Sequence, residues 1–289
     1  MLGVLRILVP VDLSDRCLGM IPYVKEVARK YRSEIVLLHV VRPLYAIPET
    51  GVSAPAIVPV SRAMIADASE RLDQFGGPDL DGFPVRRLVY EGSPEEQIVA
   101  TAQTEDVQLV IMPTHGYGVF RRFLIGSVTS KVLHDVHCPV LTGAHSKEHS
   151  DTGRVKISNI ACAIDLGPSS GDTLQWASRL ASDFQSTLSV VHVIPRLEPS
   201  LRVVFSSDLK EQMEAMVRSD IEKLQMTTAA KQVTICIQEG DVARAVSCHA
   251  KSVGADLVVI GRGIGGQAGR LRTNAYGIIQ QSPCPVLSV

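Results

Sequence analysis

The stretch DVQLVIMPTHGYGVFRRFLIGSVTSKVLHDVHCPVLT, residues 106–142, carries the pattern that decides the fold. An apolar run at 109–112 ends in a Pro-Thr-His-Gly corner and a basic loop, after which Gly126-Ser127 opens an amphipathic segment. A second apolar run follows Cys138-Pro139. This order predicts strand, loop, helix and strand. The loop and the helix start would then lie beyond the carboxyl ends of parallel strands, where such sheets bind ligands.

Length and composition set the class of protein. The chain has 289 residues, a formal net charge of -1 and 45% hydrophobic residues, which suits two domains of about 150 residues each. The near-zero charge argues against a nucleic-acid partner, and no apolar run approaches the roughly 18 residues of a membrane span. The sequence shows no signal-peptide pattern and no CxxC pair among its six cysteines, so a reduced, cytoplasmic protein is expected.

The first half of the chain alternates apolar runs with helical periods. Strands are predicted at 6–12, 35–41 and 83–90, and helices at 14–32, 61–75 and 94–104, the last with Ser93 as its cap. Residues 43–60 are rich in proline and predict a long mobile connection, a candidate lid. Continuous apolar strands separated by helices are typical of a parallel sheet covered on both faces, and therefore of an α/β fold.

The second half repeats the first. Asp12 and His39 stand 27 positions apart, as do Asp165 and His192. The pairs and runs EG at 91–92, DVQLVI at 106–111 and CPVL at 138–141 recur in the same order as EG at 239–240, ADLVVI at 255–260 and CPVL at 284–287. Such a long period indicates a duplicated domain. We expect a first domain at 1–144, a polar linker at 145–154 and a second domain at 155–289.

Two aspartates end the first strand of their copies. The carboxylate of Asp12 or Asp165 would accept hydrogen bonds from an amine or hydroxyl of a ligand in the sheet crevice. The alternative is a helix cap or turn residue. Recurrence favours a shared role, although a structural role would recur as well.

A phosphate site is the second candidate. Gly116, Gly126 and Ser127 would let the backbone and a helix N-terminus approach an anion, and Arg121 and Arg122 lie in the loop between them. The alternative is a glycine turn, a serine cap and two solvated arginines, and spacing alone favours it.

The remaining motifs do not predict a site. The run Gly261–Gly266 satisfies GxGxxG, but no acid follows about 20 residues on, so we reject a dinucleotide site. The segment at 169–173 predicts a helix cap, and no histidine spacing predicts a metal site. His39 and His192 lie in apolar strands and are interpreted as core residues with satisfied hydrogen bonds.

Several runs together make the chain resemble the universal stress protein family in its tandem two-domain form: ILVPVDLS at 7–14, IVLLHVV at 35–41, EGSP at 91–94, THG at 114–116, GSVTSKVL at 126–133 and CPVL at 138–141. The resemblance implies two tandem Rossmann- or flavodoxin-like domains, each with a five-stranded, mostly parallel sheet between helices. Because the last strand of that family commonly pairs across a dimer, it also implies a pseudo-dimer of the two copies within one chain. Whether two chains form a homodimer stays open.

One branch of that family binds ATP through Gly-x-x-Gly, nine residues and Gly-Ser/Thr. Here Gly116, nine residues and Gly126-Ser127 match, whereas Pro113, which has no N–H, holds the first glycine position. In the second copy Gly261 stands opposite Pro113, but no Gly-Ser pair follows.

The resemblance therefore implies ATP or AMP as the ligand, with Mg only if ATP is bound. Asp12 would meet the adenine, and Val40 would line its pocket. The full set that it implies is Pro10, Val11, Asp12, Val40, Met112, Pro113, His115, Gly116, Gly126, Ser127, Val128, Thr129, Asp165, Gly261 and Gly263.

Three functions remain open on the sequence. The first is a stress-response protein that binds an adenine nucleotide in its first domain and acts as a regulatory or signalling module. The second is an interaction or scaffold protein with degenerate pockets. The third is a slow ATP hydrolase, for which Asp12 and His115 are the only evident general bases.

Overall fold

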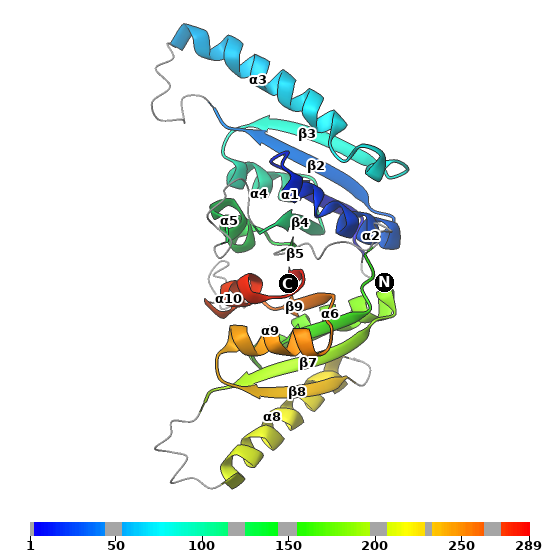
Figure 1. Ribbon diagram of the computed structural model, residues 1–289, viewed down its shortest axis with the longest axis vertical. Helices are drawn as coiled ribbons and strands as arrows, with labels where there is room; N and C mark the ends of the chain where they lie inside the picture. Colours follow the sequence, from blue (N-terminus) through cyan, green and yellow to red (C-terminus); the bar gives the residue numbers. More distant parts are fainter. Residues whose placement is uncertain are drawn as a thin grey trace. The chain divides into compact units, whose positions relative to one another are not determined.

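The computed structural model describes residues 3–43, 54–114, 125–143, 155–196, 207–228, 233–262 and 273–289. The chain divides into two compact units, Gly3–Val155 and Lys156–Val289, each of which combines parallel strands with helices (Figure 1). The candidate linker at 145–154, and residues 44–53 of the expected connection, lie outside the described residues.

The first unit contains one parallel sheet. Its described strands are β1 (Arg6–Pro10), β2 (Glu34–Val41), β3 (Val85–Glu91), β4 (Leu109–Pro113) and β5 (Val140–Gly143), paired in the order β3-β2-β1-β4-β5. Its helices are α1 (Asp15–Leu18), α2 (Ile21–Tyr31), α3 (Ala54–Gln74), α4 (Pro94–Thr104) and α5 (Ser127–Asp135), with a short 3-10 helix η2 (Gly77–Leu80).

The second unit repeats this arrangement. Its described strands are β6 (Asn159–Ala163), β7 (Thr187–Ile194), β8 (Thr234–Glu239), β9 (Leu257–Ile260) and β10 (Val286–Ser288), paired in parallel in the order β8-β7-β6-β9-β10. Its helices are α6 (Ser170–Phe184), α8 (Ser207–Thr228), α9 (Val242–Ser252) and α10 (Thr273–Gln281). The expected α/β fold in two tandem copies is confirmed.

Burial explains why these runs form central strands. Ile7 and Leu8 of β1 and Val110 and Ile111 of β4 are fully buried, as expected for strands covered by helices on both faces. In each unit the first strand lies between two neighbours that the chain reaches in opposite directions, which makes a topological switch point. Ligands bind beyond the carboxyl ends of the strands at such a point.

Two expected helices differ from those observed. The helix expected at 61–75 begins at Ala54, so the last part of the expected mobile connection at 43–60 is helical. Pro55 is compatible with this because the first turn of a helix needs no N–H partner. The helix expected at 14–32 is divided into α1 and α2 around Gly19 and Met20, with Pro22 in the first turn of α2. No described helix combines the length and the apolar character that crossing a membrane requires.

Candidate functional site

The corner after β1 holds Asp12 in a fixed position. Its Oδ1 accepts hydrogen bonds from the Ser14 backbone N–H at 3.0 Å, the Ser14 hydroxyl at 2.5 Å and the Cys17 thiol at 3.1 Å. The residue between them, Leu13, has a φ of 61°. A non-glycine residue in this region is strained, and such strain persists where the surrounding structure imposes it, often at functional sites.

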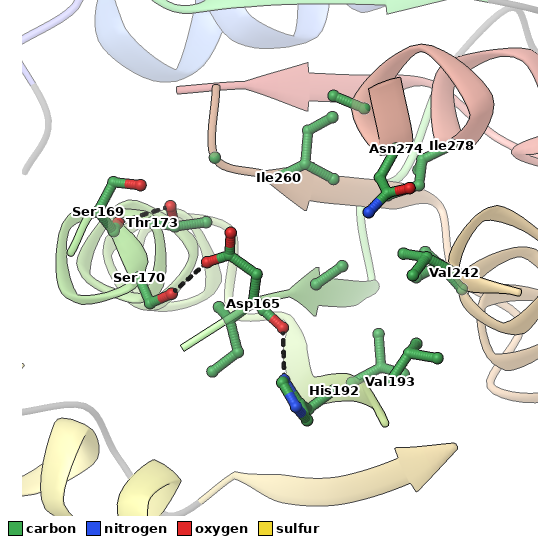
Figure 2. Close-up of a pocket in the computed structure, with 16 residues that line it drawn as sticks. Asp165, Ser169, Ser170, Thr173, His192, Val193, Val242, Ile260, Asn274 and Ile278 are labelled. Atoms are coloured by element: carbon green, nitrogen blue, oxygen red, sulfur yellow. Dashed lines mark hydrogen bonds between the residues drawn. The ribbon is translucent and has the colours of Figure 1, made fainter. Parts of the chain in front are cut away.

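The corner after β6 repeats this geometry in the second unit. Oδ1 of Asp165 accepts a hydrogen bond from the Ser170 hydroxyl at 3.0 Å (Figure 2). It also accepts one from the Gly167 N–H at 2.8 Å. Leu166 has a φ of 57°, matching Leu13. Each aspartate therefore serves as a turn residue, and each still lies at the switch point where a ligand would meet it. The two interpretations of the sequence are compatible.

The histidines of β2 and β7 brace these corners. Nδ1 of His39 lies 2.8 Å from the carbonyl oxygen of Val11, and Nδ1 of His192 lies 2.9 Å from that of Ile164. Each ring has the hydrogen bond that was expected, but both rings are half-buried and are not core residues. His192 also borders the pocket of the second unit, which the sequence interpretation as a core residue did not include.

The start of α5 is tied to the end of β4. The Gly126 N–H donates to the Thr114 carbonyl at 2.9 Å, and the Thr129 hydroxyl donates to the Pro113 carbonyl at 3.2 Å. Gly126 is the N-cap and has no side chain to offer the first N–H groups of the helix. Those groups and the positive end of the helix dipole are suited to an anion.

The structure brings most of the expected residues of the first copy to one edge of the sheet. Pro10, Val11 and Asp12 end or follow β1, Val40 lies near the end of β2, and Met112 and Pro113 end β4. Gly126, Ser127, Val128 and Thr129 form the cap and first turn of α5. His115 and Gly116, like Gly263 of the second copy, lie outside the described residues.

The second unit has a pocket of about 180 Å³ at the corresponding edge. Polar groups from four places surround it: Asp165 after β6, Ser170 at the start of α6, His192 of β7 and Asn274 of α10 (Figure 2). Its lining includes Ser169, Ser170, Thr173, Val193, Ile260, Gly261 and Ile278. The sequence had assigned 169–173 only to a helix cap and had not singled out Asn274. Residues 169–173 and Asn274 lie about a hundred positions apart in the sequence, and no spacing motif connects them.

Gly261 lies against α6. A Cβ at this position would come within 2.6 Å of the Thr173 hydroxyl oxygen, which itself donates to the Ser169 carbonyl at 2.9 Å. Thr173 is almost fully buried. Close packing against Thr173 therefore explains the glycine at position 261, independently of any ligand.

Comparison with known proteins agrees with this duplicated architecture. The model of the universal stress protein family matches residues 4–142 and again residues 156–289. The chain belongs to the universal stress protein family. Its tandem form follows from the two matches.

Individual relatives support the same assignment. Universal stress protein MJ0531 of Methanocaldococcus jannaschii is 28% identical over 138 residues, 47% of this chain and 79% of that protein. Universal stress protein A homolog 1 of Coxiella burnetii is 28% identical over 137 residues, 45% of this chain and 94% of that protein. A universal stress protein structure from Archaeoglobus fulgidus covers 98% of this chain and 95% of its own, with a TM-score of 0.64 and 18% identity, and shows the shared fold.

The thiol of this universal stress protein's first corner stays protonated. Burial, followed by the charge of Asp12, raises the pKa of Cys17 to about 12. A protonated thiol can donate to the carboxylate but is a weak nucleophile. Within the described ranges, this corner included, no three histidine, cysteine or acidic side chains gather as metal ligands would.

Proposed function

We propose that this tandem universal stress protein binds an adenine nucleotide, ATP or AMP, in its first unit and acts as a regulatory or signalling module in the stress response. The observation that carries the proposal is the pairing, at one switch point, of the oriented Asp12 carboxylate with the helix start at Gly126. Asp12 would accept from the adenine amine, and the first N–H groups of α5 would face the phosphates. Mg would accompany ATP only.

Isothermal titration of the full chain with ATP and AMP tests this proposal. Asp12→Ala should lower the affinity at least about tenfold, as expected for loss of a hydrogen bond to a charged group. Asp165→Ala, the matched change in the second unit, should leave most of the binding in place. Circular dichroism of both variants controls for folding. Absence of binding to the intact protein at millimolar nucleotide would rule the proposal out.

A second function, an interaction or scaffold protein, is favoured by the corner at Pro113. Pro113 has no N–H to offer, and its carbonyl already accepts the hydroxyl of Thr129. Gly126→Arg would block the first site. Under the scaffold function, a deletion strain complemented with this variant should survive stress as well as one complemented with the unaltered protein. Under the nucleotide function, it should not.

Three further predictions accompany the proposal: the pseudo-dimer of the two copies, a cytoplasmic location, and hydrolysis that is at most slow. ATP turnover that survives purification and disappears in Asp12→Ala would support the hydrolase.

A further inference from the structure

Helix α9 forms one wall of the pocket in the second unit. Val242 (Figure 2) and Val246 stand one turn apart on this helix, and both line the pocket. At the pocket end of α9, the N-cap Asp241 accepts a hydrogen bond from the Arg244 N–H at 2.9 Å, so this end is held by a local cap alone. The position of the wall therefore depends on what anchors the rest of the helix to the sheet.

A buried histidine supplies that anchor, about one turn further along α9. His249 is 3% exposed, and its Nε2 lies 2.9 Å from the hydroxyl oxygen of Ser189 on β7. This histidine shares a face of the helix with the two valines, because it lies seven and three positions after them. The same strand, β7, carries His192 and Val193, which border the pocket. The pair of His249 and Ser189 therefore joins the helix that forms the wall to a strand that borders the pocket.

The first unit has an uncharged, non-titrating pair at the equivalent place. Thr101 stands where the second unit has His249, and the strand registers make Val36 the counterpart of Ser189. Thr101 and Val36 are both buried, and neither side chain can take up a proton. Helix α4 of the first unit therefore packs on its sheet without a histidine at this position, whereas α9 depends on a group that titrates near neutral pH.

No charged group among the described residues compensates a proton on this ring. Burial is the one cause that lowers the pKa of His249 below its usual value of 6.5. Ser189 offers only a neutral hydroxyl, so a proton on the ring would place an unpaired charge in the core, which costs free energy. The other titratable groups on α9 and on the strands and helix packed against it do not contribute to this shift; they are Arg244, Cys248 and Lys251 of α9, His192 of β7, Cys236 and Glu239 of β8, Tyr276 of α10 and Cys162 of β6.

We propose that acid opens the pocket of the second unit, because protonation of His249 releases α9 from β7 and moves the wall of Val242 and Val246 away from the pocket. The folded ring binds a proton less readily than a ring released into water. The closed form therefore loses stability as the pH falls below about 6.5. The first unit, with Thr101 at this place, keeps α4 in position. A fall in pH thus changes the pocket of one unit and leaves the equivalent helix of the other as it was.

Hydrogen exchange of the full chain at about pH 7.5 and about pH 5, corrected for the chemical exchange rate, tests this proposal. The protection of α9 should fall at least about fivefold more than that of β7, since about 1.5 pH units below 6.5 set an upper limit of about thirtyfold. The protection of α4 should not fall in this way. Fluorescence of Trp176, the one tryptophan, which lies on α6, monitors whether the second unit stays folded at both pH values.

A double variant supplies the matched control. Ser189→Val with His249→Thr gives the second unit the pair that the first unit already packs in its core, so the variant should fold and lose the response of α9 to acid. His249→Thr alone should lose it too. His192→Asn changes the histidine that borders the pocket and should keep the response.

Three results would overturn the proposal. They are an equal fall in the protection of α9 and β7, which would mean that the unit unfolds as a whole, a response that persists in the double variant, and a response that disappears in His192→Asn. No nucleotide is present in this experiment, so its outcome is independent of whether the first unit binds one.

Discussion

The corners after β1 and β6 hold an aspartate in the same backbone frame with different side chains. Leu13 and Leu166 share the same strained φ, and each aspartate accepts a hydrogen bond from the residue five positions on. That residue is Cys17 in the first unit and Ser170 in the second. Duplication therefore kept the frame that orients the carboxylate, while the groups around it diverged.

The divergence continues around each site. The strand registers of Ile7 with Leu109 and of Ile160 with Leu257 place Pro113 and Gly261 at equivalent positions. The offset of 153 positions between Asp12 and Asp165 makes Met20 the counterpart of Thr173. Ser170 and Thr173, which line the second pocket, therefore carry hydroxyls where their counterparts Cys17 and Met20 carry sulfur. Two sites of one fold in one chain would then select different ligands.

The largest effect is expected from filling the close approach in the second unit. Gly261→Ala should destabilise it by about 1–3 kcal/mol, because the new Cβ would overlap the buried Thr173 hydroxyl. Pro113→Ala should change the first unit by less than about 1 kcal/mol. Denaturation followed by Trp176 fluorescence measures the second unit, and hydrogen exchange of β1 peptides measures the first.

A double mutant gives the control. Thr173→Ala removes the hydroxyl that the new Cβ would meet, so Gly261→Ala should cost less in that background. Equal costs in both backgrounds would mean that the packing explanation of Gly261 is wrong.

The sequence was sufficient for the fold because its signals were local and repeated. The apolar runs at 7–11 and 35–41, their recurrence in the second half and the Gly126-Ser127 helix start each reflect one element and its neighbours. The start of α3 was missed because the prolines at 43–60 were interpreted as signs of a mobile connection. Pro55 lies in the first turn of α3, where a helix tolerates proline, whereas the structure offers no such explanation for Pro59, the sixth residue of the helix.

The pocket of the second unit was missed for a different reason. Ser169, Thr173 and Asn274 acquire a common role only when α6 and α10 lie on either side of β9. The donation from Cys17 to Asp12 was missed in the same way, since a lone cysteine in a helix carries no pattern. Such side-chain contacts depend on tertiary packing that periodicity does not encode.

A smaller effect is expected from removing the donor five positions after each aspartate. Ser170→Ala should cost about 1–2 kcal/mol, because a hydroxyl bonded to a carboxylate is a strong donor. Cys17→Ala should cost about 1 kcal/mol or less, since a thiol donates weakly and Asp12 keeps both bonds from Ser14. Cys17→Ser should be tolerated, as Ser170 occupies the same place. Denaturation of each unit measures the two losses of stability. A larger loss from Cys17→Ala than from Ser170→Ala would contradict the prediction.

The smallest effect at neutral pH concerns a buried histidine. His249 of α9 is 3% exposed and lies 2.9 Å from the Ser189 hydroxyl, whereas the first unit has Thr101 at the equivalent position. Burial lowers the pKa of His249 below its usual value of 6.5. The unfolded chain therefore binds a proton more readily, and the stability of the second unit should fall as the pH drops below about 6.5. His249→Thr should remove this contribution from the pH profile of Trp176 unfolding and leave that of the first unit unchanged. If the pH profile of His249→Thr matches that of the unaltered protein, His249 is not the source of the pH dependence, because the two proteins differ at this residue alone.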